Sequence, residues 1–225
     1  MRYFPAELIG LGFGSELLYS FVIIVCSLMI YIGTKELYEL SSYKGIKFFR
    51  QAFLFFAIAY FFRTISKFFI LFSYQKISPF HPIFLLSITS LIFIYFSFLA
   101  IFYLLQSFMW KKWNKWPHLI YLFHVLALLI AVATILSRSH FFYLGANVLL
   151  LISIIIIVGI RYMGSDNKKS YNLYAIYLLL FIFWILNIVD ILIPRFLETA
   201  QLFIYLLSSG IFLLILYKVL TRVGK

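Results

Sequence analysis

The chain of 225 residues is 65% hydrophobic and 22% aromatic, whereas only 12% of its residues are charged. Soluble domains are about half apolar and about a quarter charged, so a water-soluble fold of this size is excluded. The counts of 10 Gly, 5 Pro and 1 Cys also exclude a collagen-like repeat and a disulfide scaffold. The composition predicts an all-α, polytopic membrane protein.

Seven apolar stretches are long enough to cross a bilayer as helices, which takes about 20 mostly apolar residues. In chain order they are about 15–34, 48–72, 80–107, 117–137, 141–161, 171–193 and 199–218. Barrel strands are excluded, because stretches such as LLLISIIIIVGI lack the alternation of apolar and polar residues. The loops are short, the longest at about 35–47, so we expect a single integral membrane domain over residues 1–225.

Basic residues are distributed unevenly between the two sets of loops that this seven-helix bundle would have. One set holds Lys35, Lys44, Lys47, Arg50, Lys111, Lys112, Lys115, Arg161, Lys168, Lys169, Lys218, Arg222 and Lys225, and the other holds Arg2, Lys76, Arg138 and Arg195. Lys and Arg in short loops stay on the cytoplasmic side. We therefore expect a multi-pass protein of the cell membrane with its N-terminus outside and its C-terminus inside.

The net charge of +12 is explained by this orientation and by attraction to the anionic headgroups of the lipid bilayer. Nucleic acid is not an expected partner, because the basic residues are spread over four loops and no recognition motif accompanies them. The aromatic and basic stretch WKKWNKW at 110–116 is typical of an anchor at the membrane surface.

Two cations lie inside the second apolar stretch, where charge is costly and usually marks a site or an essential ion pair. Arg63 lies about 22 Å along this helix from Phe48, and Lys67, four residues later, shares its face. Asp190 lies near the same end of the sixth stretch, with Asn187 one turn before it on the same side.

Further polar residues map to the same half of the predicted bundle: Glu16, Ser87, Ser90, Asn147, Trp184, Glu198 and Gln201. We expect these side chains to converge on an outward-facing pocket. Two interpretations remain open. In the first, Arg63 and Lys67 bind an anionic group, and Asp190 and Glu16 are their resting counter-ions. In the second, the network is structural: Arg63 pairs with Asp190, and Lys67 extends to the headgroups.

The sequence predicts no metal site, no cofactor and no catalytic residue. The four histidines, His81, His118, His124 and His140, lack the spacing of metal ligands and are expected to be interfacial or packed. No nucleophile-elbow, phosphate-loop or dinucleotide motif occurs. Cys26 lies among apolar residues and is expected to be a packing residue.

Three functions remain open. The preferred one is a receptor-like or accessory protein, which binds a small or lipid ligand in the outward-facing pocket and acts through a protein partner at the basic cytoplasmic loops. The alternative is a transporter or permease for a small anionic solute, although the inner half of the bundle is poor in polar residues. An intramembrane enzyme ranks last. Abundant Phe, Ile, Tyr and Lys favour a prokaryotic source.

Overall fold

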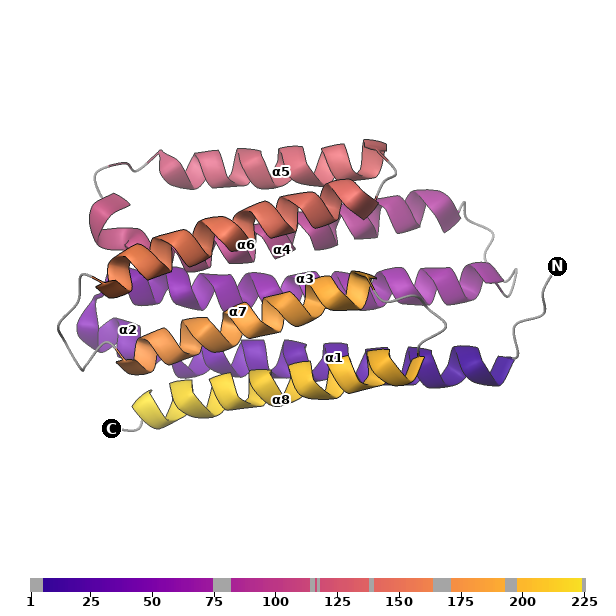
Figure 1. Cartoon of the computed structure of the whole chain (residues 1–225), viewed down its shortest axis with the longest axis horizontal. Helices are drawn as coiled ribbons and strands as arrows, with labels where there is room; N and C mark the ends of the chain where they lie inside the picture. The colour runs from indigo at the N-terminus through magenta and orange to yellow at the C-terminus, as the bar shows by residue number, and fades with distance from the viewer. Residues whose placement is uncertain are drawn as a thin grey trace.

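A computed structural model shows the chain as a bundle of helices lying along one axis (Figure 1). It describes residues 6–74, 82–113, 116, 118–137, 140–163, 171–192 and 198–223, and within them no strand occurs. The helices are α1 (Ala6–Gly33), α2 (Lys35–Ser41), α3 (Lys44–Tyr74), α4 (Pro82–Trp113), α5 (Leu119–Ser137), α6 (His140–Met163), α7 (Tyr171–Leu192) and α8 (Glu198–Val223).

Five helical segments are long and apolar enough to cross a membrane: Phe13–Ser41, Lys44–Ile70, Phe84–Trp113, Leu119–Ser137 and Thr199–Thr221. The prediction of an all-helical, membrane-type protein is thereby confirmed. Helices α6 and α7 contain shorter apolar segments, Phe142–Ile156 and Ala175–Asp190. The count of seven spans and their orientation remain predictions.

The helices continue beyond the apolar stretches that predicted them. Helix α3 begins at Lys44, α4 ends at Trp113 and α8 ends at Val223, because interfacial Lys, Trp and Tyr side chains can extend a helix into the headgroup region. The predicted loop at 35–47 was wrong in part, since it contains the short helix α2. Its sequence, KELYELS, is too polar and too short to resemble a membrane span.

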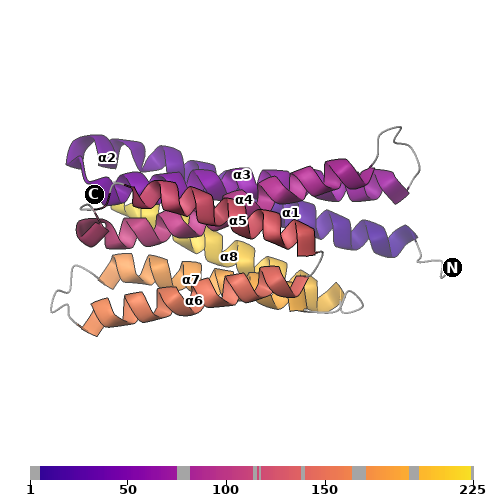
Figure 2. The ribbon, with the colours of Figure 1, turned by 90° about the horizontal axis from the view of Figure 1, so that it is seen from above.

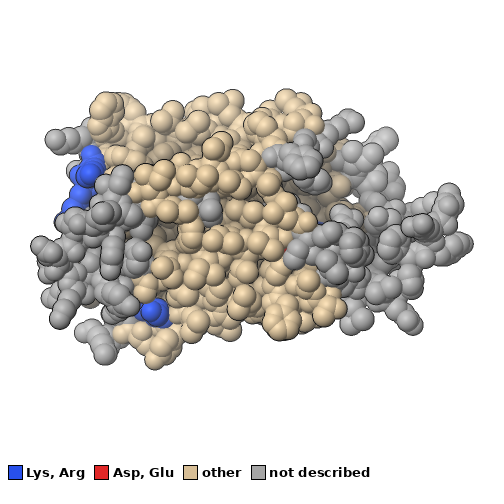
Figure 3. All heavy atoms as spheres, in the orientation of Figure 1, with Lys and Arg blue, Asp and Glu red and all other residues tan. Residues whose placement is uncertain are grey.

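Several sequence predictions fall on residues outside the described ranges. These are the helix starts at Phe80 and Pro117, the helix end at Ile193, the side chains of His140, Arg161, Glu198 and Arg222, and the residues Arg2, Lys76, His81, Lys115, Arg138, Lys168, Lys169, Arg195 and Lys225. The Lys and Arg residues of the loops that the structure describes lie at one end of the bundle. On the face shown in Figure 3, the visible Lys and Arg atoms lie toward the end where α8 finishes, and the middle carries neither sign of charge.

Successive long helices run in opposite directions, so the bundle has two distinct ends (Figures 1 and 2). We call them the basic end, where α3 and α7 begin and α4 and α8 finish, and the Arg63 end, where α3 and α7 finish. Helix α1 packs on α3 and α8, α3 packs along α4, and α5 and α7 extend this assembly. Helices α6 and α7 form a separate flank in Figure 2, and α6 contacts its neighbours α5 and α7 only lightly.

Aromatic side chains fill the core between α3, α7 and α8. Phe53 and Phe212 are fully buried, and the Phe212 ring lies 4.6 Å from that of Phe183 and 6.1 Å from that of Phe53, measured between centroids. Gly33 allows α1 and α8 to approach, because a Cβ there would lie 2.8 Å from a methyl group of Leu220. The outward face of α5 is apolar and exposed, as expected for contact with lipid.

Candidate functional site

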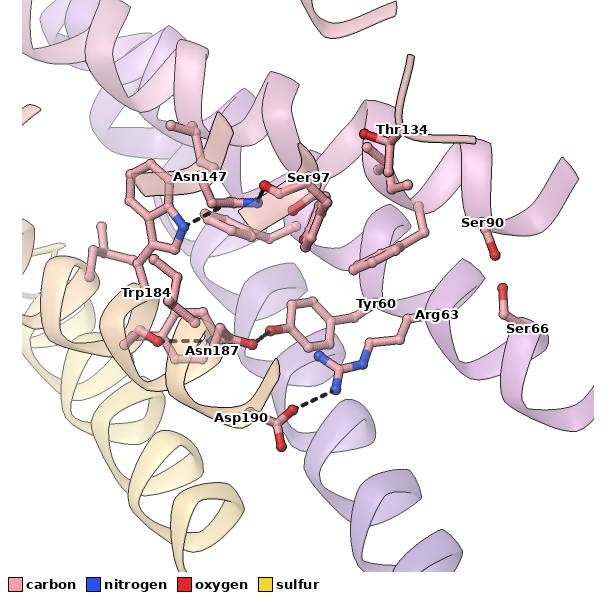
Figure 4. Close-up of a pocket in the computed structure, with 18 of the residues that line it drawn as sticks. Tyr60, Arg63, Ser66, Ser90, Ser97, Thr134, Asn147, Trp184, Asn187 and Asp190 are labelled. Atoms are coloured by element: carbon pink, nitrogen blue, oxygen red, sulfur yellow. Dashed lines mark hydrogen bonds and ion pairs between the residues drawn. The ribbon is translucent and has the colours of Figure 1, made fainter. Parts of the chain in front are cut away.

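A cavity of about 1050 Å³ lies between α3 and α4 on one side and α6 and α7 on the other, with α1, α5 and α8 contributing to its wall (Figure 4). Ten of the side chains that the sequence analysis assigned to the pocket line it: Glu16, Arg63, Lys67, Ser87, Ser90, Asn147, Trp184, Asn187, Asp190 and Gln201. The side chain of Glu198 lies outside those that the structure describes. The structure therefore brings these residues together, whereas their role in binding remains a prediction.

Four charged side chains form one cluster on the cavity wall. The Arg63 guanidinium donates from Nη2 to Glu16 Oε1 at 3.1 Å and to Asp190 Oδ2 at 3.2 Å, and its Nε lies 3.3 Å from Glu16 Oε1 (Figure 4). Lys67 Nζ lies 2.9 Å from Glu16 Oε2. The cluster contains two positive and two negative groups, so the charges balance inside the bundle.

Lys67 pairs with Glu16 on α1, as the first interpretation expected of a resting counter-ion, and its extension to the headgroups stays a prediction. Arg63 and Lys67 are one helical turn apart on α3, and α1 packs against that face. Glu16 therefore accepts from both cations, with one carboxylate oxygen for each. Asp190 on α7 completes the shell around Arg63 from the other side of the bundle.

The cations of the cluster are more accessible than its carboxylates. The side chain of Lys67 is 37% exposed and that of Arg63 is 15% exposed, against 12% for Glu16 and 10% for Asp190. Arg63 donates from Nε and Nη2, and Figure 4 shows its guanidinium directed toward Asp190. Lys67 is therefore the most accessible charge of the cluster.

Two tyrosines hold Arg63 in place, and the sequence analysis missed both. The guanidinium carbon lies 5.6 Å from the ring centroids of both Tyr19 and Tyr60, within the range of a cation–π contact. Their hydroxyl oxygens lie 2.9 Å apart, and Asn187 Oδ1 accepts from Tyr60 at 2.8 Å and from Tyr19 at 3.1 Å. Tyr60 precedes Arg63 by three residues, a helical spacing that could have revealed it.

A second polar group lies deeper in the bundle. Trp184 Nε1 donates to Asn147 Oδ1 at 3.0 Å, which joins α7 to α6, and Asn147 Nδ2 donates to the Tyr143 carbonyl at 2.8 Å. Ser97 of α4 lies beside Asn147 in Figure 4. We call Ser97, Asn147 and Trp184 the polar belt, because the cavity changes character there.

The cavity beyond the polar belt, toward the basic end, is almost entirely apolar. Its lining there includes Ile101, Leu104, Leu105, Phe108, Ile154 and Leu180. The lining ends at Tyr177 and Phe108. The Tyr177 hydroxyl lies 3.0 Å from Ser107 Oγ, which donates to the Gly45 carbonyl at 2.7 Å. The sequence analysis placed the pocket in one half of the bundle only, because apolar lining residues carry no sequence signal that separates them from lipid-facing ones.

His124 of α5 lies outside the cavity lining and has a different environment. Its Nδ1 lies 2.7 Å from the Tyr95 hydroxyl and its Nε2 lies 3.2 Å from the Tyr103 hydroxyl, which joins α5 to α4. Within the described ranges, no three His, Cys, Asp or Glu side chains are grouped so that they could hold a metal ion.

One relative is similar over nearly the whole chain. It is an "Uncharacterized protein" of Archaeoglobus fulgidus, 33% identical over 225 residues, with 97% of each chain covered. No protein-family model matches the chain, and no solved structure matches it.

Proposed function

We propose that this chain, which belongs to the same family as the Archaeoglobus fulgidus protein, binds a ligand with an acidic group in the cavity near Arg63 and acts as a receptor-like or accessory membrane protein. The carrying observation is that the two cations of the buried cluster, Arg63 and Lys67, lie on the wall of a cavity of about 1050 Å³ and are its most accessible charges. Ligand pockets are typically about 300–1,000 Å³ and contain a few polar groups in an apolar wall.

The ligand test compares two variants that each remove one positive charge. Inorganic phosphate, glycerol 3-phosphate and acetate are titrated against the purified protein while the melting temperature is followed. We expect at least one of these anions to raise the melting temperature, since a ligand at 100 times its Kd adds about 2.7 kcal/mol to the free energy of unfolding. Lys67→Met should reduce this shift, whereas Lys35→Met should not, because Lys35 pairs with Glu39 at the basic end. Equal shifts of the melting temperature in both variants, or no shift with any anion, would refute the binding of an acidic group at this site.

The proposed topology has seven spans, with α6 and α7 as the fifth and sixth. These helices have 24 and 22 residues, about 36 and 33 Å, which suffices for a hydrocarbon core of about 30 Å. In the proposed orientation the N-terminus is outside and the basic end faces the cytoplasm of a prokaryotic cell, where Lys111 and Lys112 are available to an acidic protein partner.

Cysteine labelling tests this orientation. In a Cys26→Ser background, Ser137→Cys lies at the Arg63 end of α5 and Trp116→Cys lies beyond the basic end of α4. We expect a membrane-impermeant maleimide to label Ser137→Cys in intact cells, and Trp116→Cys only after permeabilisation. The opposite pattern would reverse the orientation, and labelling of both from outside would contradict the span through α5.

A transporter for an anionic solute is the second candidate, and the length of the cavity favours it. The lining runs along α4 from Ser87 to Phe108, about 32 Å, which equals the hydrocarbon thickness of a bilayer. Tyr177 and its bond to Ser107 close the path at the basic end. Vesicles containing the protein should then take up labelled phosphate or glycerol phosphate, faster with Tyr177→Ala. Absence of flux for anions that do bind would favour the receptor-like function.

A further inference from the structure

We propose that the natural ligand is a single-chain amphiphile, with an acidic, oxygen-rich head at Arg63 and Lys67 and an apolar chain in the part of the cavity beyond the polar belt. This inference rests on the proposed function, because it names the ligand class of the same cavity. It adds a requirement for an apolar chain, which a small anion does not satisfy.

The first argument is the division of the cavity wall into two chemically distinct parts. Along α4, the hydroxyl groups of the lining, Ser87, Ser90 and Ser97, all precede the apolar residues Ile101 to Phe108. Along α7, the polar lining from Asp190 to Trp184 spans about 9 Å and is followed by Leu180. A ligand that matches this wall is polar at one end and apolar at the other.

The second argument is length. The apolar part extends from Ser97 to Phe108, which is about 16 Å along α4. One leaflet of a bilayer has an acyl layer of about 15 Å, half of the hydrocarbon core. The apolar part therefore accommodates one extended lipid chain, and Tyr177 limits its depth.

The third argument is volume. A cavity of about 1050 Å³ exceeds what a small anion fills, because one water occupies about 30 Å³ of the liquid. With phosphate alone at Arg63, the apolar part would have to stay empty or hold water against Leu104 and Leu180, and both states are unfavourable. An alkyl chain supplies the missing van der Waals contacts.

The head is acidic because the accessible charges of the cluster are positive. Arg63 and Lys67 both line the polar part of the cavity. A phosphate ester such as a lysophosphatidate supplies an acidic, oxygen-rich head of this kind.

The test is a chain-length series on the complete protein in nanodiscs. Labelled glycerol 3-phosphate and its hexanoyl, octanoyl and decanoyl esters are dialysed to equilibrium, free ligand is measured in the aqueous phase, and binding to empty nanodiscs is subtracted. We expect the affinity to rise about three- to fourfold for each added methylene, as for transfer from water to an apolar site. Monodecanoylglycerol, which lacks the phosphate, should bind at least tenfold more weakly than the decanoyl phosphate ester.

Two neighbouring positions on α6 provide a matched pair of variants. Ile154 lines the apolar part of the cavity, whereas Ile155 is 46% exposed on the outer face. Ile154→Trp should weaken binding of the decanoyl ester at least tenfold and leave glycerol 3-phosphate unchanged. Ile155→Trp should change neither by more than twofold.

Each outcome decides the question. If glycerol 3-phosphate binds and its acyl esters bind no more tightly, the ligand is not an amphiphile, but the binding of an acidic group at Arg63 and Lys67 is supported. If no phosphate compound binds, the proposed binding of an acidic group at Arg63 and Lys67 is refuted as well. Equal binding of monodecanoylglycerol refutes the acidic head. If Ile154→Trp does not fold, the series on the unmodified protein still decides. The source of the ligand is tested by mass spectrometry of amphiphiles co-purified with the protein, where a phospholipid-derived ester indicates the membrane and a free fatty acid indicates a carboxylate head.

Discussion

Removal of Arg63 by Arg63→Met is the most direct test of the charged cluster. Met retains much of the aliphatic length of Arg but removes the three contacts to Glu16 and Asp190. Glu16 keeps Lys67 at 2.9 Å, whereas Asp190, only 10% exposed, loses its described cationic partner. Breaking a buried ion pair from one side costs about 3–5 kcal/mol, so we expect a loss of that size in the free energy of unfolding.

Asp190→Asn should cost less, about 1–3 kcal/mol, because Arg63 keeps Glu16 and the amide oxygen still accepts. The combination of both substitutions should cost less than the sum by at least about 1 kcal/mol, since no unpaired carboxylate then remains at position 190. The control is Lys35→Met, whose pair with Glu39 at 3.8 Å is largely exposed, and the expected loss is about 0–1 kcal/mol.

The assay is reversible unfolding in mixed micelles with a rising fraction of sodium dodecyl sulfate, followed by tryptophan fluorescence. The expected order of stability is wild type and Lys35→Met, then Asp190→Asn, then the double variant and Arg63→Met. A loss below about 1 kcal/mol for Arg63→Met would refute the assignment of this residue to a buried ion pair. Strict additivity of the double variant would show that Arg63 and Asp190 do not interact.

Two further predictions concern the contacts between helices. His124→Phe removes the ring nitrogens that contact the hydroxyls of Tyr95 and Tyr103; the same titration should show a loss of about 1–3 kcal/mol, and retention of full stability would contradict the hydrogen bonds. Gly45→Val places a branched side chain where even a Cβ would lie 2.8 Å from the Trp110 ring. We expect overpacking to lower the free energy of unfolding by about 1–3 kcal/mol, which is measured as a lower melting temperature with a shifted Trp emission. An unchanged melting temperature would contradict this close contact.

The membrane character of the fold was predictable because apolar length is a direct physical requirement of a helix in lipid. The ends of helices were less predictable, since Lys44 and Trp113 belong to helices although they lie outside the apolar stretches. Helix α2 was missed, because its seven residues have neither the length nor the composition of a span. Polar residues in apolar stretches indicated which side chains converge, since Glu16, Arg63 and Asp190 form one cluster, whereas their role in binding stays a prediction.

The partners of each charge could not be predicted from spacing. A sequence shows that Arg63 and Lys67 share a face, but the choice of Glu16 as the partner of Lys67 depends on how α1 packs against α3. The tyrosines around Arg63 were overlooked because Tyr is common in this chain, with 17 residues, so no single one stands out. The apolar part of the cavity was also not predictable: Ile154 and Ile155 are identical in sequence, and only the packing of the helices shows that the first lines the cavity and the second is exposed.

The location of Glu16 on α1, beside the cations of α3, has a consequence for biogenesis. Translation delivers the chain from its N-terminus, so the guanidinium of Arg63 reaches the translocon when only the preceding helices have been made. A lone cation in lipid is costly, but the carboxylate of Glu16 already lies in the first span. Glu16 can therefore offset one of the two cations as soon as the first two spans are made, whereas Asp190, which completes the charge balance of the cluster, arrives with α7 only near the end of synthesis.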